Sequence, residues 1–166
     1  QKSRGPDHPE TATAMNHLGE AHLAEGHLAE AAPLLDRALA IREKSLQPGD
    51  RDLGVSLSDR AALSAAQGDF AKAKPLLERA VKTLETALGP DDPNVAQSLE
   101  NLAEVNRAMG DPAKAEPLLQ RALKAKERSL RPDDPSVAAT LNSMAALHSA
   151  RGEHAKAEPL LQRALQ

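Results

Sequence analysis

The sequence predicts an all-α fold, an α-α superhelix (solenoid) of about four helical hairpins, and three observations support this prediction. A 42-residue repeat runs through the chain and spaces its glycines at Gly26, Gly68, Gly110 and Gly152. The octamer EPLLQRAL at 116–123 returns unchanged at 158–165. Alanine and leucine dominate a composition with only 1% aromatic residues, which favours helices packed through small side chains. A fixed period in this range is typical of solenoids, in which each repeat buries its apolar face against its neighbours.

The third repeat indicates how one hairpin is encoded. Asp92 suits a helix N-cap, and Pro93 suits the first helical position, where the missing N–H costs nothing. Apolar and small residues then recur at helical spacing until Gly110, a residue that readily takes the left-handed conformation ending a helix. A second helix is expected at about 111–130, with Pro117 inside it.

We expect a single array over residues 1–166. Its approximate repeats are 5–46, 47–88, 89–130 and 131–166, the last one truncated. Both ends fall within a repeat, so the chain is expected to be a piece of a longer array. Leu160, Leu161 and Leu165 would then expose apolar surface, which predicts either a homo-oligomer formed end to end through the terminal repeats or a neighbouring segment that covers these leucines.

Charge and composition exclude several classes of partner. The 21 basic and 24 acidic residues are well mixed and give a net charge of −3, so no basic nucleic-acid footprint is expected. No apolar run approaches the ~20 residues of a membrane span, and no signal peptide is recognisable. The absence of cysteine excludes disulfides and thiolate metal sites. We expect a cytoplasmic protein with neither a nucleic-acid nor a membrane partner.

No catalytic residue, metal site or cofactor is expected. The glycines are isolated helix stops rather than parts of a phosphate-binding loop. Open solenoid grooves rarely provide the water-excluding pocket that paired carboxylates need for acid–base catalysis. His17 and His22 are five residues apart, off the same helical face, and no His-Glu-x-x-His pattern occurs. We interpret His8 as an N-cap and assign the others to the surface or to turns: His27, His148 and His154.

The repeat resembles a known family. Seven positions of the third repeat match the spacing of tetratricopeptide repeats: Leu99, Leu102, Ala103, Gly110, Ala115, Leu119 and Ala122. With GPDDPNVA entering the first helix and AEPLLQRAL in the second, the 42-residue form is similar to the repeats of kinesin light chain and its bacterial relatives over residues 5–166. HEAT and armadillo repeats share this period, but they lack a glycine turn followed by alanines at these offsets.

The resemblance implies a right-handed superhelix whose concave groove, lined by the first helix of each repeat, binds a peptide or a partner helix. The implied lining is Asn16, His17, Glu20, Ser58, Asp59, Ala62, Glu100, Asn101, Glu104, Arg107, Asn142, Ser143, Ala146 and Ser149. In family members an Asn at the position of Asn101 often bonds a peptide's backbone or terminal carboxylate. His17, Asp59 and Ser143 replace it in the other repeats, so a clamp of several asparagines is not intact. Without Tyr or Trp anchors, we expect weak recognition through polar and charged contacts.

Two features leave alternatives open. Arg60 occupies the slot of a large apolar residue, and it either snorkels to water in a degenerate repeat or pairs with a ligand carboxylate. The arginines that recur once per repeat form either a basic ladder or, as we favour, a solvated face with inter-repeat ion pairs: Arg37, Arg79, Arg121 and Arg163.

The leading functional hypothesis is a protein–protein interaction scaffold. The alternative is a structural or regulatory spacer that self-associates within a larger multidomain protein. An enzyme is not expected.

Overall fold

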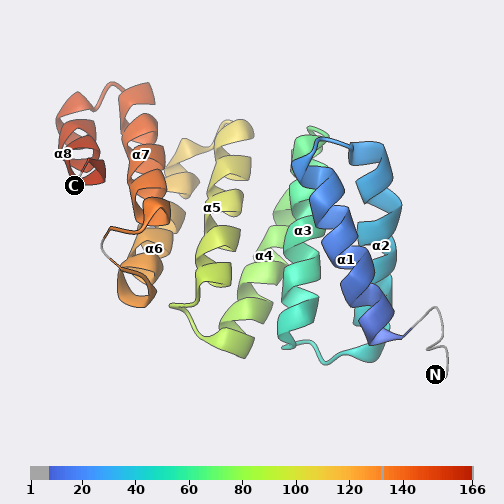
Figure 1. The fold of residues 1–166 in the computed structure, drawn as a ribbon. Helices are drawn as coiled ribbons and strands as arrows, with labels where there is room; N and C mark the ends of the chain where they lie inside the picture. The colour runs from blue at the N-terminus through green and yellow to red at the C-terminus, as the bar shows by residue number, and fades with distance from the viewer. Residues whose placement is uncertain (1–7, 132, 166) are drawn as a thin grey trace. The chain divides into compact units, whose positions relative to one another are not determined.

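The computed structural model describes residues 8–131 and 133–165, which form eight α-helices and no strand. The helices are α1 (Pro9–Ala24), α2 (Leu28–Ser45), α3 (Arg51–Ala66), α4 (Phe70–Leu88), α5 (Pro93–Ala108), α6 (Pro112–Ser129), α7 (Pro135–Ala150) and α8 (His154–Ala164) (Figure 1). Each odd-numbered helix turns back into the next helix to form a hairpin. The prediction of an all-α solenoid of helical hairpins is therefore confirmed.

The chain divides into two compact units, which we call unit 1 (residues up to Ala87) and unit 2 (residues from Leu88). Unit 1 contains the hairpins α1–α2 and α3–α4, and unit 2 contains α5–α6 and α7–α8. The division lies within one residue of the boundary expected between the second and third repeats. The single array over residues 1–166 stays a prediction.

The first helix of each hairpin begins at a capping residue. Asp50, Asp92 and Asp134 each accept a hydrogen bond from the backbone N–H two residues further on, at 2.8 Å. His8 accepts the equivalent bond through Nδ1 at 3.2 Å. The capping role predicted for His8 is therefore confirmed.

The turn after α1 is a Schellman motif centred on a glycine. Gly26 has a φ of +79°, a conformation that costs glycine little because it has no Cβ. The N–H of His27 donates to the carbonyl of His22 at 2.8 Å, and the N–H of Gly26 donates to that of Leu23 at 3.1 Å. Positive φ recurs at the three equivalent glycines: Gly68, Gly110 and Gly152.

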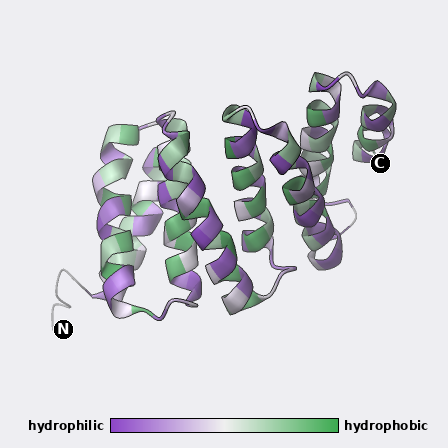
Figure 2. Cartoon of the chain, turned by 180° about the vertical axis from the view of Figure 1, so that it is seen from behind, coloured by the Kyte–Doolittle hydropathy of each residue, from purple (hydrophilic) through white to green (hydrophobic). Residues whose placement is uncertain are grey.

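The second helix of each hairpin continues through its internal proline, at Pro33, Pro75, Pro117 and Pro159. Both kinds of helix contain hydrophobic and hydrophilic residues, drawn as green and purple segments in Figure 2. Among the described residues, no helix has the length and apolar character that a membrane span requires.

Small residues allow close helix packing in unit 1. A Cβ added at Gly19 would lie 2.6 Å from Leu35 Cδ2, and one at Gly54 would lie 2.7 Å from Leu84 Cδ2. Both leucines are almost fully buried, so α1 packs closely on α2 and α3 on α4.

A core cluster of unit 2 contains larger side chains. Its buried members are Ala103, Ala115, Leu119, Leu123, Val137, Leu141, Met144 and Leu147. Of the three leucines expected to expose apolar surface, Leu160 packs against this cluster and is half-buried. Leu161 and Leu165 are exposed, as expected.

Ion pairs link the second helices of neighbouring repeats. Arg79 donates to Glu43 at 2.9 Å in unit 1, and Arg163 donates to Glu127 at 2.5 Å in unit 2. For these two arginines the prediction of inter-repeat ion pairs is confirmed. All four side chains are substantially exposed, so each pair contributes little to stability.

Candidate functional site

A groove of 630 Å³ lies in unit 2, and we call it the unit 2 groove. Residues from α5, α6 and α7 line it: Gln97, Glu100, Asn101, Ala103, Glu104, Arg107, Ala115, Leu119, Lys126, Ser136, Ala139, Ser143, Ala146, Leu147 and Ala150. The structure thus brings together several residues that the family resemblance implied, namely Glu100, Asn101, Glu104, Arg107, Ser143 and Ala146. Asn142 and Ser149 are exposed on α7 but are not among the lining residues.

The Arg107–Glu104 ion pair and the Asn101 side-chain amide lie on the side of the groove formed by α5. Arg107 donates to both carboxylate oxygens of Glu104, from Nε at 2.8 Å and from Nη2 at 2.5 Å. This bidentate contact lowers the pKa of Glu104 and raises that of Arg107. Both side chains are more than half exposed, so the pair is screened by solvent and open to a ligand. Asn101, which accepts a bond from Gln97 at 3.1 Å, adds an amide group able to donate and accept.

A buried ion pair lies beneath this side of the groove. Lys126 is 5% exposed, and its Nζ lies 2.8 Å from each carboxylate oxygen of Glu100. The same ammonium donates to the carbonyl of Ser136 at 3.2 Å and to Thr140 Oγ1 at 3.0 Å. Glu100 therefore holds α5, α6 and α7 together at the base of the groove, and its carboxylate is already engaged.

The corresponding residues of unit 1 form a closed polar cluster. Asn16 Nδ2 donates to Asp59 Oδ2 at 2.7 Å and to Glu20 Oε1 at 3.2 Å, and its Oδ1 accepts from Ser56 at 2.8 Å. Asn16 is only 1% exposed, so the expectation that it lines an open surface is wrong. The reason is that Ser56 and Asp59 on α3 pack directly over α1. His17 is exposed, and Ser58 and Ala62 are half-buried.

Asp59 is the most strongly perturbed acid of this cluster. Its pKa is raised to about 7, mainly by burial and in smaller part by the nearby Glu20 carboxylate, whereas the hydrogen bond from Asn16 opposes the shift. Near neutral pH this carboxyl therefore changes its protonation state inside the polar cluster of unit 1.

Arg42 is a buried cation in unit 1 that sequence reasoning missed. Its guanidinium is 3% exposed and donates to Ser56 Oγ at 2.7 Å, to the carbonyl of Asp52 at 2.9 Å and to Thr13 Oγ1 at 3.1 Å. Arg42 lies 84 residues, or two repeat lengths, before Lys126. A search for basic residues recurring at twice the repeat length would have found both.

Arg60 is part of an internal network. Its side chain is 19% exposed; Nε donates to Asp36, and Nη1 donates to Ser64 Oγ at 2.8 Å. The interpretation that Arg60 snorkels to water is therefore wrong. Its charge is paired within unit 1, between α3 and α2.

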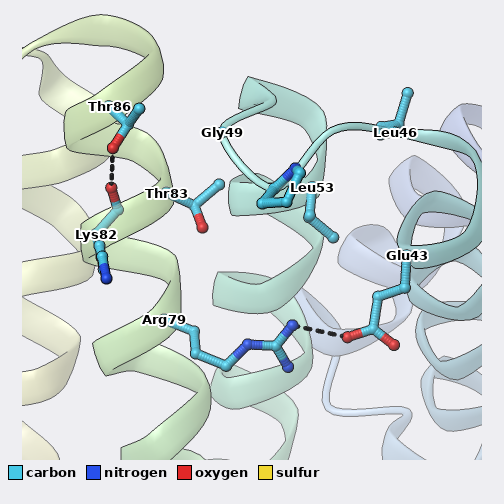
Figure 3. Close-up of a pocket in the computed structure, with 9 residues that line it drawn as sticks. Glu43, Leu46, Gly49, Leu53, Arg79, Lys82, Thr83 and Thr86 are labelled. Atoms are coloured by element: carbon cyan, nitrogen blue, oxygen red, sulfur yellow. Dashed lines mark hydrogen bonds and ion pairs between the residues drawn. The ribbon is translucent and has the colours of Figure 1, made fainter.

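A second pocket, of 580 Å³, lies near the α2–α3 connection in unit 1 (Figure 3). Its lining is Glu43, Leu46, Pro48, Gly49, Leu53, Arg79, Lys82, Thr83 and Thr86, none of which the sequence had singled out for binding. Figure 3 shows Arg79 on α4 extending to Glu43 on α2, and Thr86 bonds the carbonyl of Lys82 at 2.9 Å. The unit 2 groove is the better candidate site because it gathers residues that the family resemblance implied, whereas this pocket gathers none of them.

Of the histidines assigned to the surface or to turns, His27 and His154 are exposed, as expected, and His148 is not. His148 is 5% exposed, and its Nδ1 lies 2.6 Å from Glu153 Oε2, so assigning it to the surface is wrong. This contact lowers the pKa of Glu153.

At the α1–α2 turn, single ligand atoms of His22, Glu25 and His27 lie within 4.8 Å of one another, a geometry that could hold a metal ion. Helical spacing did not reveal this cluster because the turn, not the helix, brings His27 back.

The sequence matches one family model, described as Tetratricopeptide repeat, over residues 1–44, 52–128 and 100–166. None of the curated proteins matches the chain.

Several solved structures share its fold. A kinesin light chain-like protein with nearly identical TPR-like repeats from Podosopora anserina is 27% identical, with a TM-score of 0.84 over 95% of this chain and 74% of that one. BtubC (BKLC) from P. vanneervenii is 22% identical, with a TM-score of 0.86 over 99% of this chain and 65% of its own. A Rap protein complexed with Competence and Sporulation Factor is 16% identical, with a TM-score of 0.83 over 95% of this chain and 42% of its own.

Proposed function

Because the chain belongs to the tetratricopeptide repeat family, we propose that it is an interaction scaffold that binds a peptide segment of a partner protein in the unit 2 groove. Proteins built from these repeats are generally non-catalytic scaffolds that bind protein partners. The observation that carries the proposal is the gathering of Asn101, Glu104, Arg107 and Ser143 along one groove of 630 Å³.

The chemistry of the groove suits a peptide that supplies its own large side chain. Its apolar lining consists mainly of alanines, among them Ala103, Ala139 and Ala146, which leave room above them. The chain's single aromatic residue is Phe70, on α4. An aromatic or leucine side chain of the peptide would cover the alanines. The amide of Asn101 would bond the peptide backbone, and a charged group would exchange with the Arg107–Glu104 pair.

A protein of the same fold supports the plausibility of such a complex. The Rap protein similar to this chain was solved with Competence and Sporulation Factor bound. The tetratricopeptide fold can therefore carry a bound partner.

A random peptide library displayed on phage tests the proposal. Peptides selected on the wild-type chain are measured again on N101A/R107A and on the matched control Q120A/K124A, which alters exposed residues of α6 outside the groove lining. We expect the groove variant to weaken the selected peptides at least tenfold, about 1.4 kcal/mol, and the control to leave them unchanged. Peptides that bind all three proteins equally would place the site elsewhere.

The second candidate is a spacer that self-associates end to end. The observation favouring it is the exposure of Leu161 and Leu165, at 45% and 89%. Light scattering over a concentration series measures this directly. A mass that rises with concentration, and that stays monomeric in L161K/L165K, would support the spacer. A strict monomer at high concentration would exclude it.

A further inference from the structure

The turn between α1 and α2 gathers two imidazoles and one carboxylate. The ring centroids of His22 and His27 are 5.9 Å apart and the rings are inclined by 49°. His27 Nδ1 lies 3.2 Å from Glu25 Oε2, and one ligand atom of each residue lies within 4.8 Å of the others. We propose that His22, Glu25 and His27 bind a divalent transition-metal ion such as Zn²⁺.

The backbone fixes the relative positions of these three residues. In a Schellman motif the residue after the left-handed glycine lies over the residue five positions earlier, here His27 over His22. The hydrogen bond from the N–H of His27 to the carbonyl of His22, at 2.8 Å, holds this register. Glu25 lies three residues after His22 and so shares its side of the helix end. The ligand set is thus built on a hydrogen-bonded turn.

The hydrogen-bonding state of His22 is a second, independent observation. Its Nδ1 is buried and, among the described residues, has no hydrogen-bond partner. Buried polar side-chain atoms in native proteins are rarely left in this state. A metal ion bound at Nδ1 would give this atom the polar partner that the described residues do not provide.

The ligand chemistry selects the class of ion. Two imidazole nitrogens and one carboxylate oxygen suit zinc and its first-row neighbours, which bind such atoms at about 2.0–2.2 Å. Two ligand atoms of a tetrahedral ion are then about 3.4 Å apart. In the structure the three ligand atoms lie within 4.8 Å of one another, so they must move closer to bind the ion. The Glu25 and His27 side chains are 64% and 55% exposed, so rotation about their side-chain bonds closes the site without moving the backbone. Water would complete the coordination.

The equivalent turns are not suited to a metal. Ser64 and Asp69, and Asn106 and Asp111, occupy the positions of His22 and His27 in the second and third repeats. In the fourth repeat His148 is engaged with Glu153 at 2.6 Å. There the position of Glu25 is taken by the cationic Arg151, which would repel a metal ion. We therefore expect one ion per chain.

Titration of the untagged full chain with Co²⁺ alone, followed by its visible absorption, tests the site, and Zn²⁺ then competes for it. We expect one Co²⁺ per chain and at least a tenfold loss of affinity in H27A and in E25Q, both changes of exposed side chains. The control H154A, an exposed histidine of α8, should bind as the wild type does. Equal losses in H27A and H154A, or no Co²⁺ band in the wild type, would overturn the proposal. Circular dichroism of each variant confirms that its helices are intact.

Discussion

Units 1 and 2 bury a cation at equivalent positions, yet they compensate its charge differently. Arg42 and Lys126 lie 84 residues apart, near the C-terminal ends of α2 and α6. Each donates to a hydroxyl, of Ser56 or Thr140, and to a backbone carbonyl on the first helix of the next hairpin. These bonds join consecutive repeats in the same way in both units.

The difference lies on the first helix of the hairpin that carries the cation. In unit 2 that helix supplies Glu100, whose carboxylate lies 2.8 Å from Lys126 Nζ. In unit 1 the equivalent residue is Asn16, which is neutral and bonds Asp59 and Glu20 instead. Unit 2 neutralises its buried cation with a direct ion pair, whereas unit 1 bonds it to two hydroxyls and a backbone carbonyl, with the Asp52 carboxylate 4.0 Å away. The comparison teaches that the repeat preserves the hydrogen-bond geometry of this position rather than its charges.

The largest effect is expected from breaking the ion pair of unit 2. K126M leaves the Glu100 carboxylate, 17% exposed, without its cation and should lower the free energy of unfolding by about 3 kcal/mol. The double variant E100Q/K126M removes both charges and should recover more than half of that loss. Urea denaturation measures both. A K126M variant within about 1 kcal/mol of the wild type would contradict the importance of the pair.

The equivalent change in unit 1 should cost less. R42M removes hydrogen bonds to Ser56 and Thr13 but strands no carboxylate in direct contact, since Asp52 Oδ2 lies 4.0 Å away and its side chain is 52% exposed. We expect a loss of about 1–2 kcal/mol in the same urea experiment. A cost equal to that of K126M would show that the two cations are compensated alike.

Unit 1 should also respond to pH through Asp59, whose equivalent in unit 2 is Ser143. The pKa of Asp59 is raised to about 7 from 3.8, so the folded state binds more protons than the unfolded state between these values. Its contribution to stability is therefore full below about pH 4 and is lost as pH rises to about 7, by at most about 1.4 kcal/mol per pH unit. The melting temperature of D59N should fall less than that of the wild type between pH 5 and 8. Parallel profiles would contradict this.

The smallest expected effect concerns the close contact of α1 and α2. Gly19 in unit 1 corresponds to Ala103 in unit 2. The methyl group of G19A would collide with the buried Leu35, and a better helix propensity offsets only part of that cost, so we expect a net loss of about 1 kcal/mol. A103G should cost a similar amount through lost packing and propensity. A stabilised G19A would show that Leu35 has room to move.

The sequence was sufficient for the fold and for part of the site. The glycine period, the Asp-Pro entries and the alanine offsets predicted the family and the hairpins because each is a local signal repeated along the chain. The family resemblance likewise anticipated Asn101, Glu104 and Arg107, which line the unit 2 groove.

The remaining features depend on contacts that a single repeat does not encode. Asn16 was expected to be exposed, but α3 covers it. Arg42 and Lys126 occupy the same repeat position, but Leu84 stands between them in the second repeat, so the position does not recur as a basic one from repeat to repeat. The cluster of His22 and His27 arises from the turn geometry rather than from helical periodicity.

The central claim, that the unit 2 groove binds a peptide of a partner protein, is tested most directly by site-specific photo-crosslinking. A benzophenone amino acid replaces either Ala146, in the groove, or Gln120, exposed on α6 outside it. The tightest peptide selected from the random library is then added and irradiated. We predict a covalent adduct with the chain labelled at position 146 and none at position 120. Crosslinking at position 120 without crosslinking at position 146 would contradict the claim.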